Sequence, residues 1–402
     1  MKRGKQNQPS REIMWSVLPS EVEENILSRL PVKFLMRFRC VCKHWCNLVT
    51  DPHFIKLQLN LSSQIQESYK LARVYCAEVC SIDVEACRNQ YIKTSGQKKA
   101  ILQTELVLPD MDGNIVGSCN GLLCLDNRHL YNLYLLNPAT KEYKRLLHPR
   151  EDDLFSWYMF GFGYNPKTDE YKVVMISYYR SENSVHCRDV YVYTIGTNPS
   201  WRSIGPTEYE IECAGHALVY GAVHWIASDT AGFIIVSFDF GDEKFRELSP
   251  PEFFRQEGIN YHTEFSDLKL VELEGFLSLY WHKYKSNFEI WVMKNYVDEQ
   301  SWTKVFSVAH PILSQFWESF KPLVILKKDE EILCGSDFEI FILDVVKNEI
   351  RILHSDECYD SGTELYFESL VSLRADGGTD LGNKQERRET EGERLALEAT
   401  GD

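Results

Sequence analysis

The chain has 402 residues, a hydrophobic fraction of 44% and a formal net charge of −15. Its length exceeds the roughly 100–200 residues of a typical domain, so we expect either two units or one large all-β body. The acidic balance argues against a nucleic-acid partner, because phosphates bind to basic surfaces. The longest apolar runs fall far short of the ~20 residues that span a bilayer, so we expect no membrane partner and a cytoplasmic and/or nuclear location.

The charge is distributed unevenly along the chain. Residues 1–60 contain ten Lys or Arg against five Asp or Glu, whereas residues 61–374 carry a net charge of −16. Residues 1–14 are basic and polar and lack the apolar core of a secretory signal, so we expect a disordered N-terminus. Residues 375–402 contain almost no large apolar side chains, which predicts a disordered charged tail.

Short helices are predicted in residues 15–60. Ser20 followed by Glu23 fits a capping box, and an apolar stripe at helical spacing leads up to Pro31, which should end the helix. Two further helical runs are KFLMRFRCV and CKHWCNLV, and Asp51-Pro52 fits an N-cap and first-turn proline of another helix. Such a small unit has a limited core, so its apolar stripes are expected to contact a partner or the neighbouring domain.

The tightest cysteine group, Cys40, Cys42 and Cys46 with His44, lacks the paired C-x-x-C spacing of a zinc site. We interpret the twelve cysteines as small buried apolar residues and predict no metal and no cofactor.

The segment LPSEVEENILSRLPVKFLMRFRCVCKHWCNLVTDPHF resembles an F-box, with Val22 in place of the commoner leucine. The resemblance implies an F-box module over residues 15–60 that docks on a Skp-type adaptor and, through it, on cullin and RING subunits. The basic charge of this segment also suits an acidic adaptor. The adaptor-binding positions implied by the resemblance are Leu18, Pro19, Val22, Ile26, Leu27, Leu30, Pro31, Leu35, Val41, Cys42 and Trp45.

A repeating pattern follows in residues 61–374. Five segments contain an apolar run, a polar turn and a closing pair of apolar residues three apart: Tyr143/Leu146, Trp201/Ile204, Phe245/Leu248, Trp302/Val305 and Ile350/Leu353. Repeats of roughly 40–50 residues with several strands predict a β-propeller. Segments 69–76, 101–108 and 363–373 can close the ring by pairing the first and last blades. The expected fold is α+β multidomain, a small all-α module followed by an all-β propeller, with six blades favoured and seven possible.

The stretch GSCNGLLCL has the spacing of a nucleophile elbow, with Cys119 in place of serine. An elbow requires a strand, a turn and a helix, but the following residues have the pattern of strands. Asn120-Gly121 is typical of a tight hairpin turn. We therefore predict a turn and no catalytic role for Cys119, and we interpret single histidines such as His224 and His282 as structural.

GSCNGLLCL, FGFGYNPKTDEYKVV, VYGAVHWIA and IVSFDFGDEKFRELSPP also resemble the plant F-box-associated, kelch-like domain of the S-locus F-box-like superfamily. The resemblance implies a propeller over residues 61–374. Together with the F-box it implies a non-catalytic substrate-recognition subunit of a Skp–cullin–F-box ubiquitin ligase, which holds a target close to the ubiquitin-charged enzyme. The alternatives are a non-degradative, sequestering F-box protein, an S-locus-type recogniser of a basic ribonuclease in pollen, and a propeller hydrolase or sugar-binding protein.

The acidic charge of residues 61–374 suggests a basic target. An acidic face can steer a basic target toward the receptor, although acidity can also serve solubility alone. The candidate target-binding residues are Glu151, Asp152, Asp153, Glu208, Glu210, Glu212, Asp329, Glu330 and Glu331.

Overall fold

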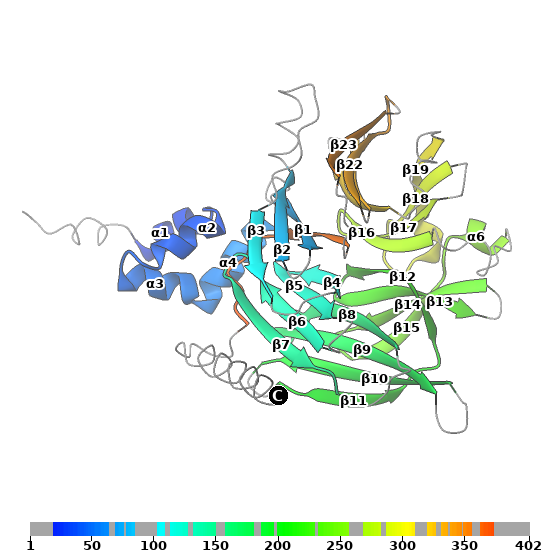
Figure 1. Cartoon of the computed structure of the whole chain (residues 1–402), viewed down its shortest axis with the longest axis horizontal. Helices are drawn as coiled ribbons and strands as arrows, with labels where there is room; N and C mark the ends of the chain where they lie inside the picture. Colours follow the sequence, from blue (N-terminus) through cyan, green and yellow to red (C-terminus); the bar gives the residue numbers. More distant parts are fainter. Residues whose placement is uncertain are drawn as a thin grey trace, which may run out of the picture.

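A computed structural model describes a helical module followed by a body of six four-stranded sheets (Figure 1). The described residues are 19–63, 69–75, 78–84, 103–108, 113–127, 132–149, 157–180, 186–196, 199–229, 232–256, 268–282, 287–309, 320–326, 331–336, 338–347, 349–355 and 362–373. The expected disordered segments, 1–14 and 375–402, lie outside these residues.

The module contains four helices: α1 Ser20–Leu27, α2 Val32–Phe38, α3 Lys43–Thr50 and α4 Pro52–Ser62. The predicted start of α4 is confirmed, because Asp51 Oδ1 accepts hydrogen bonds from the backbone N–H groups of His53 at 2.8 Å and Phe54 at 3.2 Å. Pro31 has a different role from the predicted one. Helix α1 already ends at Leu27, and Pro31 is the N-cap of α2. A proline is tolerated there because a backbone N–H at the start of a helix has no intrahelical acceptor.

Five of the sheets are formed by consecutive strands that run from the innermost to the outermost position of a blade. The first two of these blades contain β4 Gly113–Cys119, β5 Leu122–Asn127, β6 Asn132–Asn137 and β7 Glu142–Leu147, then β8 Trp157–Asn165, β9 Glu170–Arg180, β10 His186–Ile195 and β11 Trp201–Pro206. The third contains β12 Glu210–Val219, β13 Ala222–Asp229, β14 Gly232–Asp239 and β15 Lys244–Leu248.

The other two consecutive blades follow the short helix α6 Glu252–Gln256. They contain β16 Leu268–Leu273, β17 Phe276–His282, β18 Asn287–Met293 and β19 Trp302–Ala309, then β20 Lys321–Leu326, β21 Glu331–Gly335, β22 Glu339–Asp344 and β23 Glu349–Ser355. A 3₁₀ turn, η4 Glu299–Ser301, precedes β19. All five predicted closing pairs lie on the outermost strands, β7, β11, β15, β19 and β23, so the repeat interpretation is confirmed.

The remaining blade combines both ends of the propeller sequence. It contains β1 Tyr69–Tyr75, β2 Glu78–Asp83, β3 Gln103–Val107 and β24 Thr363–Phe367 in the order β24-β1-β2-β3. Strands β1 and β24 are antiparallel, with Tyr69 opposite Phe367 and Arg73 opposite Thr363. This pairing closes the ring as predicted and gives six blades rather than seven.

The inner hairpins of three blades turn in the same way. Asn120-Gly121, Tyr220-Gly221 and Glu274-Gly275 have positive φ angles of 51° and 80°, 53° and 75°, and 53° and 84°. Two consecutive positive φ angles are the signature of the type I′ hairpin turn that matches the twist of the flanking strands. The prediction of a turn at Asn120-Gly121 is therefore confirmed.

Antiparallel strands make the connections of every blade alternate between two faces of the ring. The turns between first and second strands and between third and fourth strands lie on one face. That face also carries the helical module, because α4 precedes β1 and residues 368–373 follow β24. We call it the module face. The other ends of these strands, such as the starts of β8 and β12, lie on the opposite face.

Candidate functional site

The helical module exposes several large apolar side chains. Val22 and Ile26, one turn apart on α1, are 42% and 51% exposed, and Phe34 on α2 and Val41 after it are 46% and 63% exposed. Of the predicted adaptor-binding residues, Pro19, Pro31 and Cys42 are also exposed and Leu30 is half-buried, while Leu18 lies outside the described residues. Exposed apolar groups gathered on one small unit are typical of a protein-binding surface.

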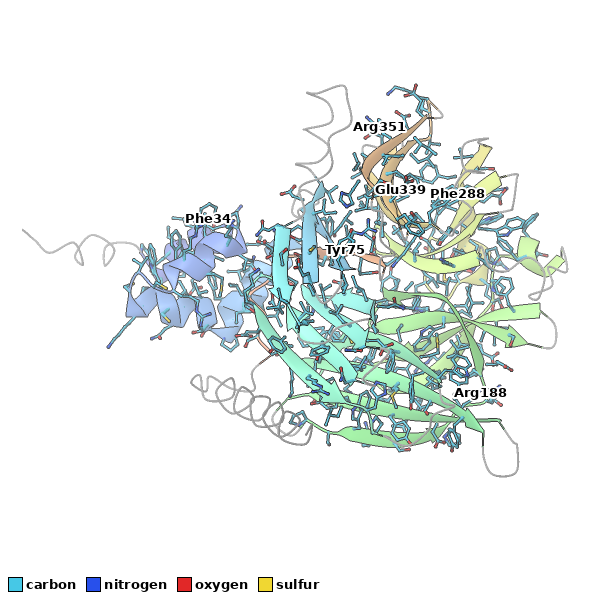
Figure 2. All side chains as sticks on the ribbon, in the orientation of Figure 1. Phe34, Tyr75, Arg188, Phe288, Glu339 and Arg351 are labelled. Carbon is cyan, nitrogen blue, oxygen red and sulfur yellow. The ribbon has the colours of Figure 1, made fainter. Side chains whose placement is uncertain are left out.

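Phe34 was not among the predicted residues. It stands apart from the buried pair Val32 and Leu35 on the same helix, and its ring carries the Arg37 guanidinium at 5.9 Å from its centroid. Figure 2 shows Phe34 at the outer part of the module, well away from the propeller strands. An apolar residue next to the core stripe of α2 was the signal in the sequence that could have identified it.

Three of the predicted positions are packed inside the module instead. Leu27, Leu35 and Trp45 are buried in a core that also contains Val49 and Phe54. Their side chains stabilise the module from within and are not open to solvent. The motif therefore contains two kinds of apolar residue that a sequence pattern cannot distinguish.

The predicted capping box is wrong. The N-cap of α1 is Pro19, which makes no side-chain cap hydrogen bond, and Glu23 is buried. Glu23 Oε1 accepts a hydrogen bond from the indole N–H of Trp45, and Glu23 Oε2 lies 2.9 Å from Nε2 of His44. A buried indole N–H requires an acceptor, and Glu23 provides it across the module.

The module is attached to the propeller by the last described segment, residues 368–373. Leu370 packs into the helical core beside Ala139, and the side-chain amide of Asn137 donates to the carbonyl oxygens of Ser369 at 3.0 Å and Val371 at 2.7 Å. On α4, Lys56 forms a 2.5 Å ion pair with Asp169 in the β8–β9 turn. The hydrogen bond from Lys56 is the main reason that the pKa of Asp169 is lowered.

The structure describes the side chains of three of the predicted acidic residues, Glu208, Glu210 and Glu331. Glu208 is exposed, and Glu210 pairs with Arg188 at 2.9 Å on the side opposite the module. Glu331, the first residue of β21, is buried and pairs with Arg351. Its inclusion was wrong, because a buried and paired carboxylate is not available to a target. The side chain of Glu212 and all of Glu151, Asp152, Asp153, Asp329 and Glu330 lie outside the described residues.

The ring encloses a small cavity between its innermost strands. This cavity of about 150 Å³ is lined by residues of the innermost strands, including His216, Glu272, Lys321 and Glu364, and it adjoins a hollow of about 540 Å³ beside Ser63. Lys321 Nζ pairs with Glu364 Oε2 at 2.7 Å. Burial, with the nearby charge of Lys321, lowers the pKa of His216 to about 4, so this imidazole is neutral at pH 7.

Cys119 lies at the end of β4, directly before the Asn120-Gly121 turn, and is buried. Burial raises the pKa of its thiol to about 12, which leaves it protonated and a poor nucleophile at neutral pH. His224 is structural as predicted: Nδ1 lies 3.1 Å from the carbonyl oxygen of Ala217, and Nε2 lies 2.9 Å from the hydroxyl of Tyr296. The side chain of His282 lies outside the described residues.

Cysteine burial was only partly predicted. Cys80, Cys119, Cys124 and Cys334 are buried, whereas Cys40 and Cys42 are exposed, so the interpretation as buried residues is wrong for these two. Within the described residues, no group of three or more His, Cys, Asp or Glu side chains is placed to hold a metal ion. No helix in the same part of the chain is long and apolar enough to cross a membrane.

Comparison with known families agrees with both parts of this architecture. The model of the F-box domain matches residues 15–57, and the model of the F-box associated beta propeller domain matches residues 71–373. Three similar proteins come from Arabidopsis thaliana. F-box protein At3g07870 is 30% identical over 72% of this chain and 72% of its own length. F-box protein CPR1 is 27% identical over 93% and 92%, and F-box/kelch-repeat protein At3g23880 is 28% identical over 77% and 85%.

Proposed function

The chain belongs to the family of F-box proteins that carry an F-box associated β-propeller domain, and we propose on this basis that it is the substrate-recognition subunit of a Skp–cullin–F-box ubiquitin ligase. In this proposal it acts in the cytoplasm or nucleus, the helical module binds a Skp-type adaptor, and the adaptor connects it to the cullin and RING subunits. The propeller binds the target. The observation that carries the proposal is an exposed apolar surface on the F-box helices, joined to a closed propeller.

The proposed role requires no chemistry from the chain itself. A bound target is held close to a ubiquitin-charged enzyme, so an encounter between separate molecules is replaced by a reaction within one complex. This gain depends on a defined geometry between adaptor and target. The Asn137 hydrogen bonds, the Leu370 packing and the Lys56–Asp169 ion pair support such a geometry, because they hold the module against one face of the propeller.

Ile26→Asp tests the adaptor contact. Ile26 is half exposed on α1, so a charge there costs the folded chain little, but burial of that charge against an adaptor is unfavourable. Burial of the exposed half of Ile26 corresponds to about half of the roughly 1.5–3 kcal/mol of a complete apolar side chain, so loss of the apolar contact alone weakens binding at least about threefold in Kd. Binding of the purified chain to a recombinant Skp-type adaptor, measured by calorimetry, should weaken by at least that factor while the melting temperature stays unchanged.

Val346→Asp is the matched control. Val346 is an aliphatic residue on the β22–β23 turn and is even more exposed than Ile26, so the same type of substitution places a charge on the propeller, outside the helical module. This variant should bind the adaptor like the original chain. Unchanged adaptor binding by Ile26→Asp, with the fold intact, would contradict the F-box assignment of this surface.

A binding-only subunit that sequesters its target has the same two surfaces. The two functions differ in what the adaptor-bound chain recruits. Co-purification of cullin together with ubiquitin transfer to the bound target supports a ligase, whereas adaptor binding without cullin or without transfer supports sequestration.

A further inference from the structure

An aromatic stack lies on the side of the propeller opposite the module. The rings of Trp157 and Tyr178 are nearly parallel, with an interplanar angle of 10° and a centroid distance of 3.8 Å. Tyr178 is only 6% exposed, whereas Trp157, which covers it, is 45% exposed. A large indole held against a buried ring and open to solvent has the character of a binding hot spot, because little side-chain freedom remains to be lost on binding.

Three neighbouring strands build this site in register. Trp157 on β8 lies opposite Tyr178 on β9, and Tyr178 lies opposite Arg188 on β10. The Arg188 guanidinium lies over the Tyr178 ring, 6.0 Å from its centroid. We call these three residues the aromatic platform. Cross-strand neighbours of this kind are held in place by the sheet itself.

The next blade holds the platform from the side. The backbone N–H of Ile211 on β12 donates to the Tyr178 hydroxyl at 3.1 Å, and Arg188 Nη2 pairs with Glu210 Oε2 at 2.9 Å. The platform therefore lies at the junction of two blades, where residues of β12 hold Tyr178 and Arg188 in place. Figure 2 shows Arg188 at the far end of its blade, across the molecule from Phe34 on the module.

Among the residues that the structure describes, three carboxylates lie close to Arg188 or Tyr209: Glu210, Glu208 and Glu247. Arg188 is offset by its partner Glu210, while Glu208 and Glu247 are exposed next to Tyr209. The Tyr209 hydroxyl donates to Glu247 Oε1 at 3.0 Å. Burial raises the pKa of Tyr209 to about 12, and the hydrogen bond to Glu247 and the charges of Glu247 and Glu208 add to this rise. Tyr209 packs against the same core cluster as Tyr178, so its carboxylate neighbours lie in the blade next to the exposed indole, and together they favour a cationic side chain.

We propose that the aromatic platform, with Glu208, is the docking site for a Lys- or Arg-containing segment of the target, in which one cation stacks on the open face of Trp157. This inference rests on the proposed function, since it assigns the target-binding surface of a substrate receptor. The charge of the site argues for a basic segment rather than an acidic or apolar one.

The position of the platform also suits this role. Strand β8 has nine residues and begins at Trp157. The turn directly after its other end contains Asp169, which pairs with Lys56 of α4. At about 3.3 Å per residue the two ends are roughly 26–30 Å apart. A target on the platform and an adaptor on the module can therefore be bound at the same time without collision.

The test measures binding of two dye-labelled decapeptides, one alternating Lys and Ser and the other alternating Glu and Ser, by fluorescence anisotropy. The protein is the full chain in complex with its adaptor. We expect the basic peptide to bind, Trp157→Ala to weaken it at least about tenfold, and Trp157→Phe to retain part of the affinity. Glu208→Gln should weaken it less, and the effect of Glu208 should fade as salt rises from 0.1 to 1 M.

Two variants on the module face serve as matched controls. Tyr220→Asn removes another exposed aromatic ring at a turn position that asparagine tolerates, and Glu349→Gln removes another exposed carboxylate. Neither should change binding. The proposal is overturned if the basic peptide does not bind, if Trp157→Ala binds it normally, or if the acidic peptide binds in its place. Adaptor capture by Trp157→Ala should be normal, so failure at the platform is distinguishable from failure of the F-box proposal.

Discussion

Leu370→Ala should weaken the helical module although Leu370 lies more than 300 residues away from it in sequence. Leu370 is buried in the same core as Leu27, Leu35 and Trp45. Truncation of a buried leucine to alanine costs about 2–5 kcal/mol, which combines the lost transfer free energy with the cavity left behind. Because the module is small, this cost is a large fraction of the free energy that keeps its helices folded.

The measurement is amide hydrogen exchange, followed separately for helices α1–α4 and for the propeller strands. In Leu370→Ala the helices should exchange faster, by a factor that corresponds to the lost 2–5 kcal/mol, while the protection of strands β8–β19 stays unchanged. Adaptor affinity should fall in parallel, because only the folded module presents its exposed apolar surface. Leu370→Met, which conserves volume, should retain most of the protection.

Leu147→Ala is the control, since Leu147 is an exposed leucine at the end of an outermost strand and its truncation should change stability by no more than about 0.5 kcal/mol. Our account of the module requires that Leu370 contribute to its core. If Leu370→Ala leaves helix exchange as slow as in the original chain, the module is stable by itself and the segment 368–373 only lies against it.

Three further predictions follow from buried positions. Gly121→Ala should reduce the hydrogen-exchange protection of the helices more than Gly275→Ala, as exchange measurements on both variants can show. The two glycines have similar φ angles, but an added Cβ lies 2.6 Å from Ser369 Cβ at Gly121 and meets nothing within 4 Å at Gly275. Cys119→Ser should leave adaptor and peptide binding unchanged. In the original chain at pH 7, mass spectrometry should find the exposed cysteines labelled by a thiol reagent well before Cys119, and rapid labelling of Cys119 would argue against its burial. Burial lowers the pKa of His224 to about 4, so the stability that its neutral form provides is present above pH 6.5 and is lost as the pH falls from 6.5 toward 4. Denaturant unfolding should show this loss of stability, and the loss should be smaller in His224→Gln.

Local patterns in the sequence determined the class of fold and most of its elements. Apolar residues at helical spacing marked the four helices, and the five closing pairs marked the outermost strands of five blades. The Asn120-Gly121 turn was also predictable, because a turn with two positive φ angles depends on the residues that form it. Closure of the propeller by pairing of β1 with β24 was predictable for a different reason. The ring has to close, and only segments at the two ends of the propeller sequence remained to close it.

The binding surfaces were decided by contacts between residues far apart in the chain. A motif records that Ile26 and Leu27 are both apolar, but only the packing of α1 against α2, α3 and Leu370 leaves Ile26 exposed and buries Leu27. Likewise, the capping pattern at Glu23 was overridden because Trp45, 22 residues later, needs a buried acceptor for its indole N–H. Such partners depend on which elements meet in three dimensions, and a linear pattern contains no record of that.

The aromatic platform is the clearest case of the same limit. Trp157, Tyr178 and Arg188 are separated by 21 and 10 residues and belong to no motif, and their alignment depends on the registers of two strand pairs. A shift of one residue in either pair would turn the affected side chain to the other face of the sheet. Register is set by the packing of the whole blade and of its neighbour, so the sequence specifies this site only through the completed tertiary structure.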